Sequence, residues 1–153
     1  MEEAVQLYEQ ACKVSPDDYQ APSLLATTYA SPGKTAKSVA SRHRSLQIIE
    51  KHLQLHPDDA RALYLGAGGL TQIGERQRAL EWTRRALAIE PDDPGVLYNV
   101  ACNYSLLGRP EEAIDCLEKA VANGFGFKQW IEHDSDLDAI RSHPRVQSLL
   151  KRP

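Results

Sequence analysis

Two histidines spaced four residues apart are the first candidates for chemistry in this sequence. His52 and His56 would lie on one face of a helix, where both imidazoles could bind the same metal ion. Two ligands are too few for a zinc site, and the sequence places no third ligand nearby. His56 also precedes Pro57, which favours the end of a helix at this point. We therefore predict no metal site and no cofactor for this chain.

The tract Gly33-Lys34-Thr35 looks like the end of a phosphate-binding loop. Such a loop needs a second glycine five residues before Gly33, where Thr28 stands, and it connects a strand to a helix. Here the tract connects two expected helices. We therefore predict no nucleotide site at this position.

The cysteines and the acidic pairs form no catalytic pattern. Cys12, Cys102 and Cys116 cannot all pair within the chain, and no His or Arg lies close to them in sequence, which favours buried, reduced thiols. Three acidic pairs recur once per repeat, which is typical of helix caps. These pairs are Asp17-Asp18, Asp58-Asp59 and Asp92-Asp93. No Ser-His-Asp order or metalloprotease spacing is present, so the sequence predicts a protein that is not an enzyme.

Positive charge is concentrated in one segment. From Ala30 to Ile49 there is no acidic residue, and the bases are Lys34, Lys37, Arg42 and Arg44. This basic segment could contact phosphate groups, an acidic partner or nucleic acid, and the alternative is a solvated helix face. No aromatic residues alternate with the bases, and the whole chain carries a formal charge of −3, so nucleic acid is a disfavoured partner.

The composition favours helices in a soluble protein. Of the 153 residues, 42% are hydrophobic but only 7% are aromatic, so the core must consist largely of Ala and Leu. No stretch approaches the roughly 18 apolar residues of a membrane span, and the acidic start at Glu2 and Glu3 does not fit a signal sequence. We predict an all-α protein located in the cytoplasm, with no membrane partner.

An internal repeat of 34 residues organises the middle of the chain. Pro57-Asp58-Asp59 returns as Pro91-Asp92-Asp93, and the same offset relates Leu63-Tyr64 to Leu97-Tyr98. Each copy predicts two helices. Asp59 or Asp93 can cap the first helix, and Gly74 or Gly108 can end it. Small residues at helical spacing would let the two helices approach closely; they are Ala67, Ala79 and Ala86.

This period and helix-turn-helix pattern resemble the tetratricopeptide repeat (TPR) family, most clearly over residues 60–127. The resemblance implies a right-handed superhelix of α-α hairpins that ends in a helical cap. The segment from Gly124 through Trp130 to Leu149-Leu150 resembles the ends of TPR arrays attached to bacterial adenylate cyclases, protein kinases and transcription regulators. That narrower resemblance implies a regulatory appendage of a larger protein.

The repeat also predicts the boundaries of the units. Residues 1–18 would be the second helix of a truncated repeat, and residues 19–59 a repeat with about seven extra residues, because Pro16 and Pro57 are 41 residues apart. Residues 60–93 and 94–127 would be regular repeats, and residues 128–153 the cap, with Trp130 and the Leu pair covering the last hairpin. We place the insertion near residues 35–44, in a second helix lengthened by two turns; a loop over residues 31–38 is the alternative.

In TPR arrays the first helices of successive hairpins line the concave face, and we expect a peptide or partner segment to bind there. The residues that the repeat projects onto this face are Gln20, Leu24, Thr27, Arg61, Tyr64, Leu65, Thr71, Tyr98, Asn99, Cys102 and Ser105. Family members that grip a terminal carboxylate use several bases, whereas Arg61 is the only base in this set. A neutral or apolar segment is therefore favoured. The alternative is that Tyr64 and Tyr98 only pack between neighbouring hairpins.

A structural role is the second hypothesis. The chain opens on a second helix without its first, and the face around Val5, Tyr8 and Cys12 would then be uncovered. This face could dock on another copy of the chain or on an upstream repeat.

Overall fold

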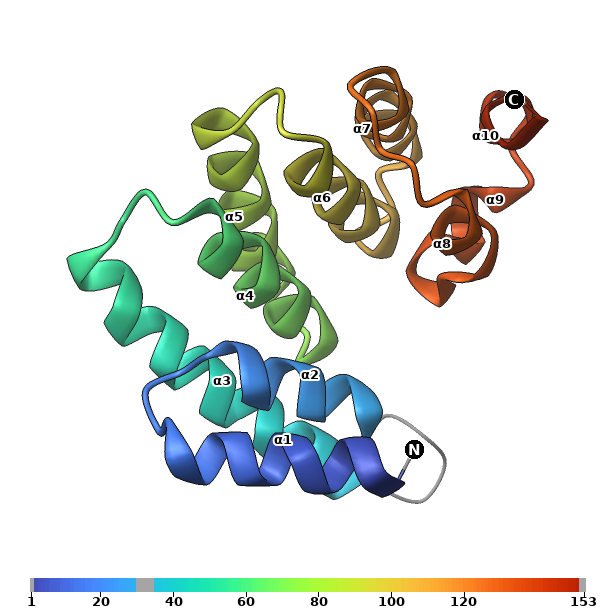
Figure 1. Ribbon diagram of the computed structural model, residues 1–153. Helices are drawn as coiled ribbons and strands as arrows, with labels where there is room; N and C mark the ends of the chain where they lie inside the picture. Colours follow the sequence, from blue (N-terminus) through green and yellow to red (C-terminus); the bar gives the residue numbers. More distant parts are fainter. Residues whose placement is uncertain (1, 30–34, 152–153) are drawn as a thin grey trace.

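The computed structural model describes residues 2–29 and 35–151, and all regular structure in those ranges is helical (Figure 1). Gly33 and Lys34 fall between these two ranges, so the tract resembling a phosphate-binding loop and part of the loop alternative lie outside the described residues. Within the described part of the chain, no helix is long and apolar enough to cross a membrane.

Two regular hairpins form the centre of the fold. The first pairs α4 (Ala60–Gln72) with α5 (Arg76–Ile89), and the second pairs α6 (Pro94–Leu106) with α7 (Pro110–Ala122). Asp59 Oδ1 accepts a hydrogen bond from the Ala62 amide at 2.9 Å, and Asp93 Oδ1 accepts one from the Val96 amide at 2.8 Å. These N-caps satisfy backbone donors that a helix leaves free at its start.

Glycine ends the first helix of each hairpin. Gly74 has φ 88° and Gly108 has φ 69°, a left-handed conformation that glycine adopts at little cost. In both turns the amide after the glycine donates to a carbonyl five residues earlier, which completes a Schellman motif. The sequence pattern of caps and glycines therefore produces two copies of the same hairpin.

Small residues allow close packing inside each hairpin. Ala67, Ala79 and Ala86 are fully buried between α4 and α5. A Cβ atom on Gly66 would lie only 2.3 Å from the Trp82 ring, so this glycine lets the indole lie against the α4 backbone. Asn103 joins the two hairpins, because its Nδ2 donates to the Tyr64 carbonyl at 3.0 Å.

The N-terminal part consists of α1 (Glu2–Val14), α2 (Gln20–Thr28) and α3 (Thr35–Leu55). With 21 residues, α3 is longer than α5, which has 14. The second helix of this unit is thus seven residues longer than α5, whereas its first helix, α2, is four residues shorter than α4. A satellite core of Val5, Cys12, Ala21, Leu25 and Tyr29 lies between α1 and α2 and is separate from the main core.

Four short elements close the C-terminal end: α8 (Lys128–His133), η1 (Ser135–Leu137), α9 (Asp138–Arg141) and α10 (Pro144–Lys151). Their buried side chains are Ile131, Leu137, Ile140, Val146 and Leu149. Trp130 was expected to cover the last hairpin, but it is 54% exposed. Ile131, one position later on the six-residue α8, occupies the buried position instead.

Arg145 fastens the cap to the last hairpin. It forms ion pairs with Glu111, Asp115 and Glu118 of α7, of which the two shortest are 2.6 Å. The hairpins follow one another along a curve, with α2, α4, α6 and α8 on its inner side and α5 and α7 on its outer side (Figure 1).

Candidate interaction surface on the inner face

Seven of the expected site residues lie on α2 and α4, the helices that follow the inner side of the curve (Figure 1). On α2, Leu24 is 44% exposed, Thr27 is exposed and Gln20 is half-buried. On α4, Arg61 is exposed, whereas Tyr64, Leu65 and Thr71 are half-buried. All seven side chains are thus at least partly exposed.

The expected residues of α6 need correction. Tyr98 is only 3% exposed, and Cys102 and Ser105 are buried as well. The reason is that the cap folds back on this helix: Phe125 stacks on Tyr98 with ring centroids 4.4 Å apart, and the Tyr98 hydroxyl donates to Asp134 Oδ2 at 2.7 Å. Tyr98 and Cys102 thus contact Asp134 of the cap, and Ser105 is buried within α6.

Asn99 lies beside this junction and is half-buried. Its Nδ2 donates to the Gly95 carbonyl within α6 at 2.8 Å. One of its two amide donors is thus used inside the helix, and the side chain lies at the edge of the inner surface.

Asp59 connects α4 with α3 and with Tyr19, the residue before α2. The sequence did not predict this role. Besides capping α4, its Oδ2 accepts hydrogen bonds from His52 Nε2 of α3 at 2.8 Å and from the Tyr19 hydroxyl at 3.0 Å. Burial alone would raise the pKa of Asp59, but the bonds from the Ala62 amide, His52 and Tyr19 outweigh it and hold the pKa below its usual value. The sequence indicated that Asp59 caps a helix. No local pattern in the sequence indicated its distant partners Tyr19 and His52.

The histidine pair is therefore used differently from a metal site. The rings of His52 and His56 lie 4.7 Å apart, but His52 Nε2 is engaged by Asp59. Among the residues that the structure describes, no group of three or more His, Cys, Asp or Glu side chains is placed to hold a metal ion.

All three cysteines are buried and unpaired with one another. Burial raises the pKa of each thiol, in the case of Cys116 to about 11. A raised pKa keeps the sulfur protonated near neutral pH and makes it a poor nucleophile.

The basic segment does not form one patch in the structure. Lys37 lies over the Tyr29 ring at 5.6 Å, and Arg44 donates to the Cys12 carbonyl of α1 at 3.2 Å. Arg42 donates instead to Ser38 Oγ. Burial lowers the pKa of its guanidinium, and the charge of Asp136 in the cap opposes this change only in part. Residues two apart on a helix point in different directions, so Arg42 and Arg44 face different elements. Lys34 lies outside the described residues.

The expected uncovered face of α1 also needs correction. Val5 and Cys12 are buried against α2, and Tyr8 packs on the same satellite core. The apolar side chains that α1 exposes are Leu7, at 60%, and Val14, at 82%.

Four aromatic residues form a cluster between α6 and the cap that sequence reasoning did not identify as a site. Phe127 and Trp130 are 58% and 54% exposed, and their rings stack with centroids 5.0 Å apart. Phe125 and Tyr98 lie behind them and are buried. The sequence feature that could have indicated this cluster is the Phe-Gly-Phe tract before Trp130, which places aromatic rings close together at the start of α8.

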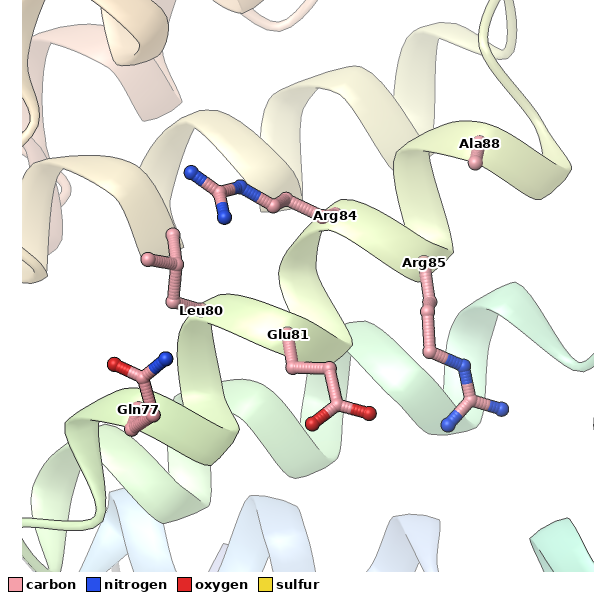
Figure 2. A pocket seen from close by; sticks show the side chains of 6 residues that line it. All are labelled: Gln77, Leu80, Glu81, Arg84, Arg85 and Ala88. Carbon is pink, nitrogen blue, oxygen red and sulfur yellow. The ribbon is translucent and has the colours of Figure 1, made fainter.

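Two hollows lie away from the inner surface. One of about 410 Å³ is lined by Asp17 and by residues of α3, including Ile48, His52 and Leu55. The other, of about 350 Å³, lies along α5, and Figure 2 shows that its six lining side chains all come from this helix. Leu80 and Arg84 point to one side of it and Glu81 and Arg85 to the other (Figure 2).

Comparison with known proteins agrees with this architecture. A family model described as tetratricopeptide repeat matches residues 94–122. No curated protein matches the sequence. A solved structure titled "Crystal structure of MamA" superposes with a TM-score of 0.55 at 19% identity, covering 95% of this chain and 80% of that one.

Two further MamA structures give the same result. One titled "Crystal structure of MamA protein" has a TM-score of 0.54 at 21% identity and covers 96% of this chain and 75% of that chain. "MamA 41-end from Desulfovibrio magneticus RS-1" has a TM-score of 0.52 at 20% identity, with coverages of 97% and 84%. At these identities the likeness shows the fold. Residues 94–122 thus match the tetratricopeptide repeat, and the described chain has the fold of an all-α solenoid of helical hairpins.

Proposed function

We propose that this chain is a non-catalytic scaffold that binds a segment of a partner protein on the inner face of α2 and α4. Such a scaffold fits a regulatory part of a larger protein, in which the partner segment could belong to the parent protein itself. The proposal extends the expectation from the repeat, with the α6 residues now assigned to the cap junction.

The observation that carries the proposal is a pair of unused polar groups on α4. Within the described residues, neither the Arg61 guanidinium nor the Tyr64 hydroxyl has a hydrogen bond or ion pair. Burial raises the pKa of Tyr64, so its hydroxyl remains a neutral donor and acceptor at neutral pH. An amphipathic ring beside a free guanidinium can bind a peptide through both apolar area and hydrogen bonds.

The surroundings limit the chemistry of the bound segment. Arg61 is the single base of the α4 set, so the surface lacks the several positive charges that hold a terminal carboxylate. Leu24 of α2 and Leu65 of α4 add partly exposed apolar area. A partly apolar segment in extended or helical conformation is the occupant that this surface fits best.

A peptide-display selection against the full chain tests the proposal. Peptides recovered with the unmodified chain should bind the Arg61→Ala/Tyr64→Ala variant at least tenfold more weakly. The helicity of this variant, measured by circular dichroism, should equal that of the unmodified chain. Gln77→Ala/Glu81→Ala on the outer side of α5 is the matched control and should bind normally. Equal affinity for the parent chain and the α4 variant would remove the site from the inner face. Tyr98 is unsuitable for this test because its loss would loosen the cap.

Self-association through α1 is the second candidate, and the exposed Leu7 and Val14 favour it. These two residues are seven apart and lie on one helix face, where a second copy could cover them. Light scattering over a range of concentrations decides the matter: a dimer that Leu7→Glu dissociates supports this role, whereas a monomer at all concentrations contradicts it.

A further inference from the structure

The exposed aromatic pair in the cap has a rigid support. We call Phe127 and Trp130 the aromatic platform. Phe125 lies behind both rings, with centroids 5.6 Å from Phe127 and 6.3 Å from Trp130, and Tyr98 lies 5.9 Å from Trp130. The rings are thus held in place by buried neighbours, although more than half of each side chain is in solvent.

The cap does not need these two rings for its own core. Its buried residues are aliphatic, and the side of α8 that faces inward is occupied by Ile131. Two adjacent, exposed aromatic side chains are unusual on a protein surface and are typical of binding sites. The platform is therefore a surface that a partner can cover without disturbing the fold.

The charges next to the platform are mostly negative. Between residues 127 and 138 the acids are Glu132, Asp134, Asp136 and Asp138, and Lys128 is the one base apart from histidine. Tyr98 connects the two features, because its ring contacts Trp130 and its hydroxyl donates to Asp134. Trp130 of the platform and Asp134 of the acidic segment are thus held by the same side chain.

Asp136 is the acid that lacks a partner. Its side chain is half-buried, and within the described part of the chain no hydrogen bond or ion pair reaches its carboxylate. Asp138, by contrast, is paired with Arg141, and Asp134 accepts from Tyr98 and from the Asp136 amide. The charged groups that act on Asp136 are Asp134 and Asp138 of the cap and Arg42 of α3. The charge of Arg42 acts on this carboxylate, but no hydrogen bond or ion pair of the described residues occupies it, so it can accept hydrogen bonds from a cation outside the chain.

From this arrangement we infer that the aromatic platform and Asp136 form a binding site for an arginine side chain of the partner segment. A planar guanidinium can stack on the Trp130 and Phe127 rings and donate to a carboxylate at the same time, whereas an ammonium group cannot stack in this way. The inference rests on the proposed function and adds the chemistry of the partner: a basic, arginine-containing segment that extends from the α4 surface to the cap.

A labelled synthetic peptide tests this site without knowledge of the natural partner. The probe is a peptide of alternating Arg and Leu, and fluorescence anisotropy with the full chain measures its affinity at low salt. The same peptide with citrulline in place of Arg keeps the planar group but loses the charge, and one with Lys keeps the charge but loses the plane. We expect the Arg peptide to bind at least tenfold more tightly than the citrulline peptide and about threefold to tenfold more tightly than the Lys peptide.

Three variants locate the binding. Phe127→Ala/Trp130→Ala and Asp136→Asn should each weaken binding of the Arg peptide at least fivefold. Leu55→Ala, which removes an exposed apolar side chain from the end of α3, should leave the affinity unchanged. The Asp136→Asn variant is expected to fold at least as well as the unmodified chain. Weaker binding by this variant would therefore not result from a loss of the fold.

Absence of binding by the parent chain, or equal affinity of all variants, would overturn the inference. The proposed function fails separately, namely if displayed peptides bind without any dependence on Arg61 and Tyr64. Displayed peptides that depend on these two residues but contain no arginine would contradict only the arginine site.

Discussion

Asp136 is a carboxylate in a position that disfavours its charge, so Asp136→Asn should stabilise the fold. Burial removes water from the carboxylate, and Asp134 and Asp138 add like charge; together they raise the pKa from 3.8 to about 6, although Arg42 opposes the change. Asn has nearly the same shape and no charge, and the backbone bond from residue 136 to Asp134 Oδ1 does not depend on the side chain.

The size of the effect follows from the two pKa values. At about 1.36 kcal/mol per pKa unit, a rise from 3.8 to about 6 disfavours folding by about 3 kcal/mol above pH 6. The side chain retains part of its contact with water, so we reduce this to about 1–2 kcal/mol.

The sign of the pH dependence is fixed by the direction of the pKa change. A group with a raised pKa in the folded state stabilises the fold below its unfolded pKa, and that stability is lost as the pH rises through the folded value. The gain from Asp136→Asn is therefore full above about pH 6. At pH 4.5 it falls to about one third of that value.

Urea unfolding at pH 7.5 and pH 4.5, followed by circular dichroism, measures this free energy. Asp138→Asn is the matched control. It relieves part of the repulsion on Asp136 but also removes the ion pair with Arg141, so it should stabilise the chain much less than Asp136→Asn. A variant at position 136 that is no more stable at pH 7.5, or a gain that does not change with pH, would refute the reasoning. An acid kept at the expense of stability is typical of a functional surface.

Two other predictions concern packing and capping. Gly66→Ala should destabilise the chain by about 1–3 kcal/mol because its Cβ would overlap the Trp82 ring, whereas Gly69→Ala has ordinary contact distances and should stabilise the helix by up to about 1 kcal/mol. Chemical denaturation compares the two, and equal effects would contradict the close approach of α4 and α5. Asp93→Ala should cost about 1 kcal/mol as a lost cap, and Asp59→Ala at least about 1 kcal/mol more because it also leaves two partners without an acceptor. Equal losses in thermal unfolding would show that the bonds from α3 and from the residue before α2 contribute nothing.

The regular part of the fold could be predicted because its signals are local. A 34-residue period, Asp caps such as Asp59 and Asp93, and turn glycines such as Gly74 each act through neighbouring backbone atoms. The seven extra residues before Pro57 likewise indicated a longer helix, and α3 has 21 residues.

The site was harder to predict because it depends on a segment outside the period. Tyr98 and Tyr64 occupy equivalent repeat positions, yet only Tyr98 is covered, since the cap follows its hairpin alone. Trp130 and Ile131 are adjacent, and a six-residue helix has too few turns for apolar spacing to decide which one faces inward. The partners of Asp59 and the position of Arg42 near Asp136 depend on the curvature of the array, which no short pattern encodes.

The most direct test of partner binding on the inner face is amide chemical-shift mapping of the full chain with its tightest displayed peptide. The account predicts the largest shift changes around Leu24 of α2, around Arg61 and Tyr64 of α4, and from Phe127 to Asp136 in the cap. Changes concentrated along the outer side of α5 and α7, or around Leu7 of α1, with none on α4, would contradict it.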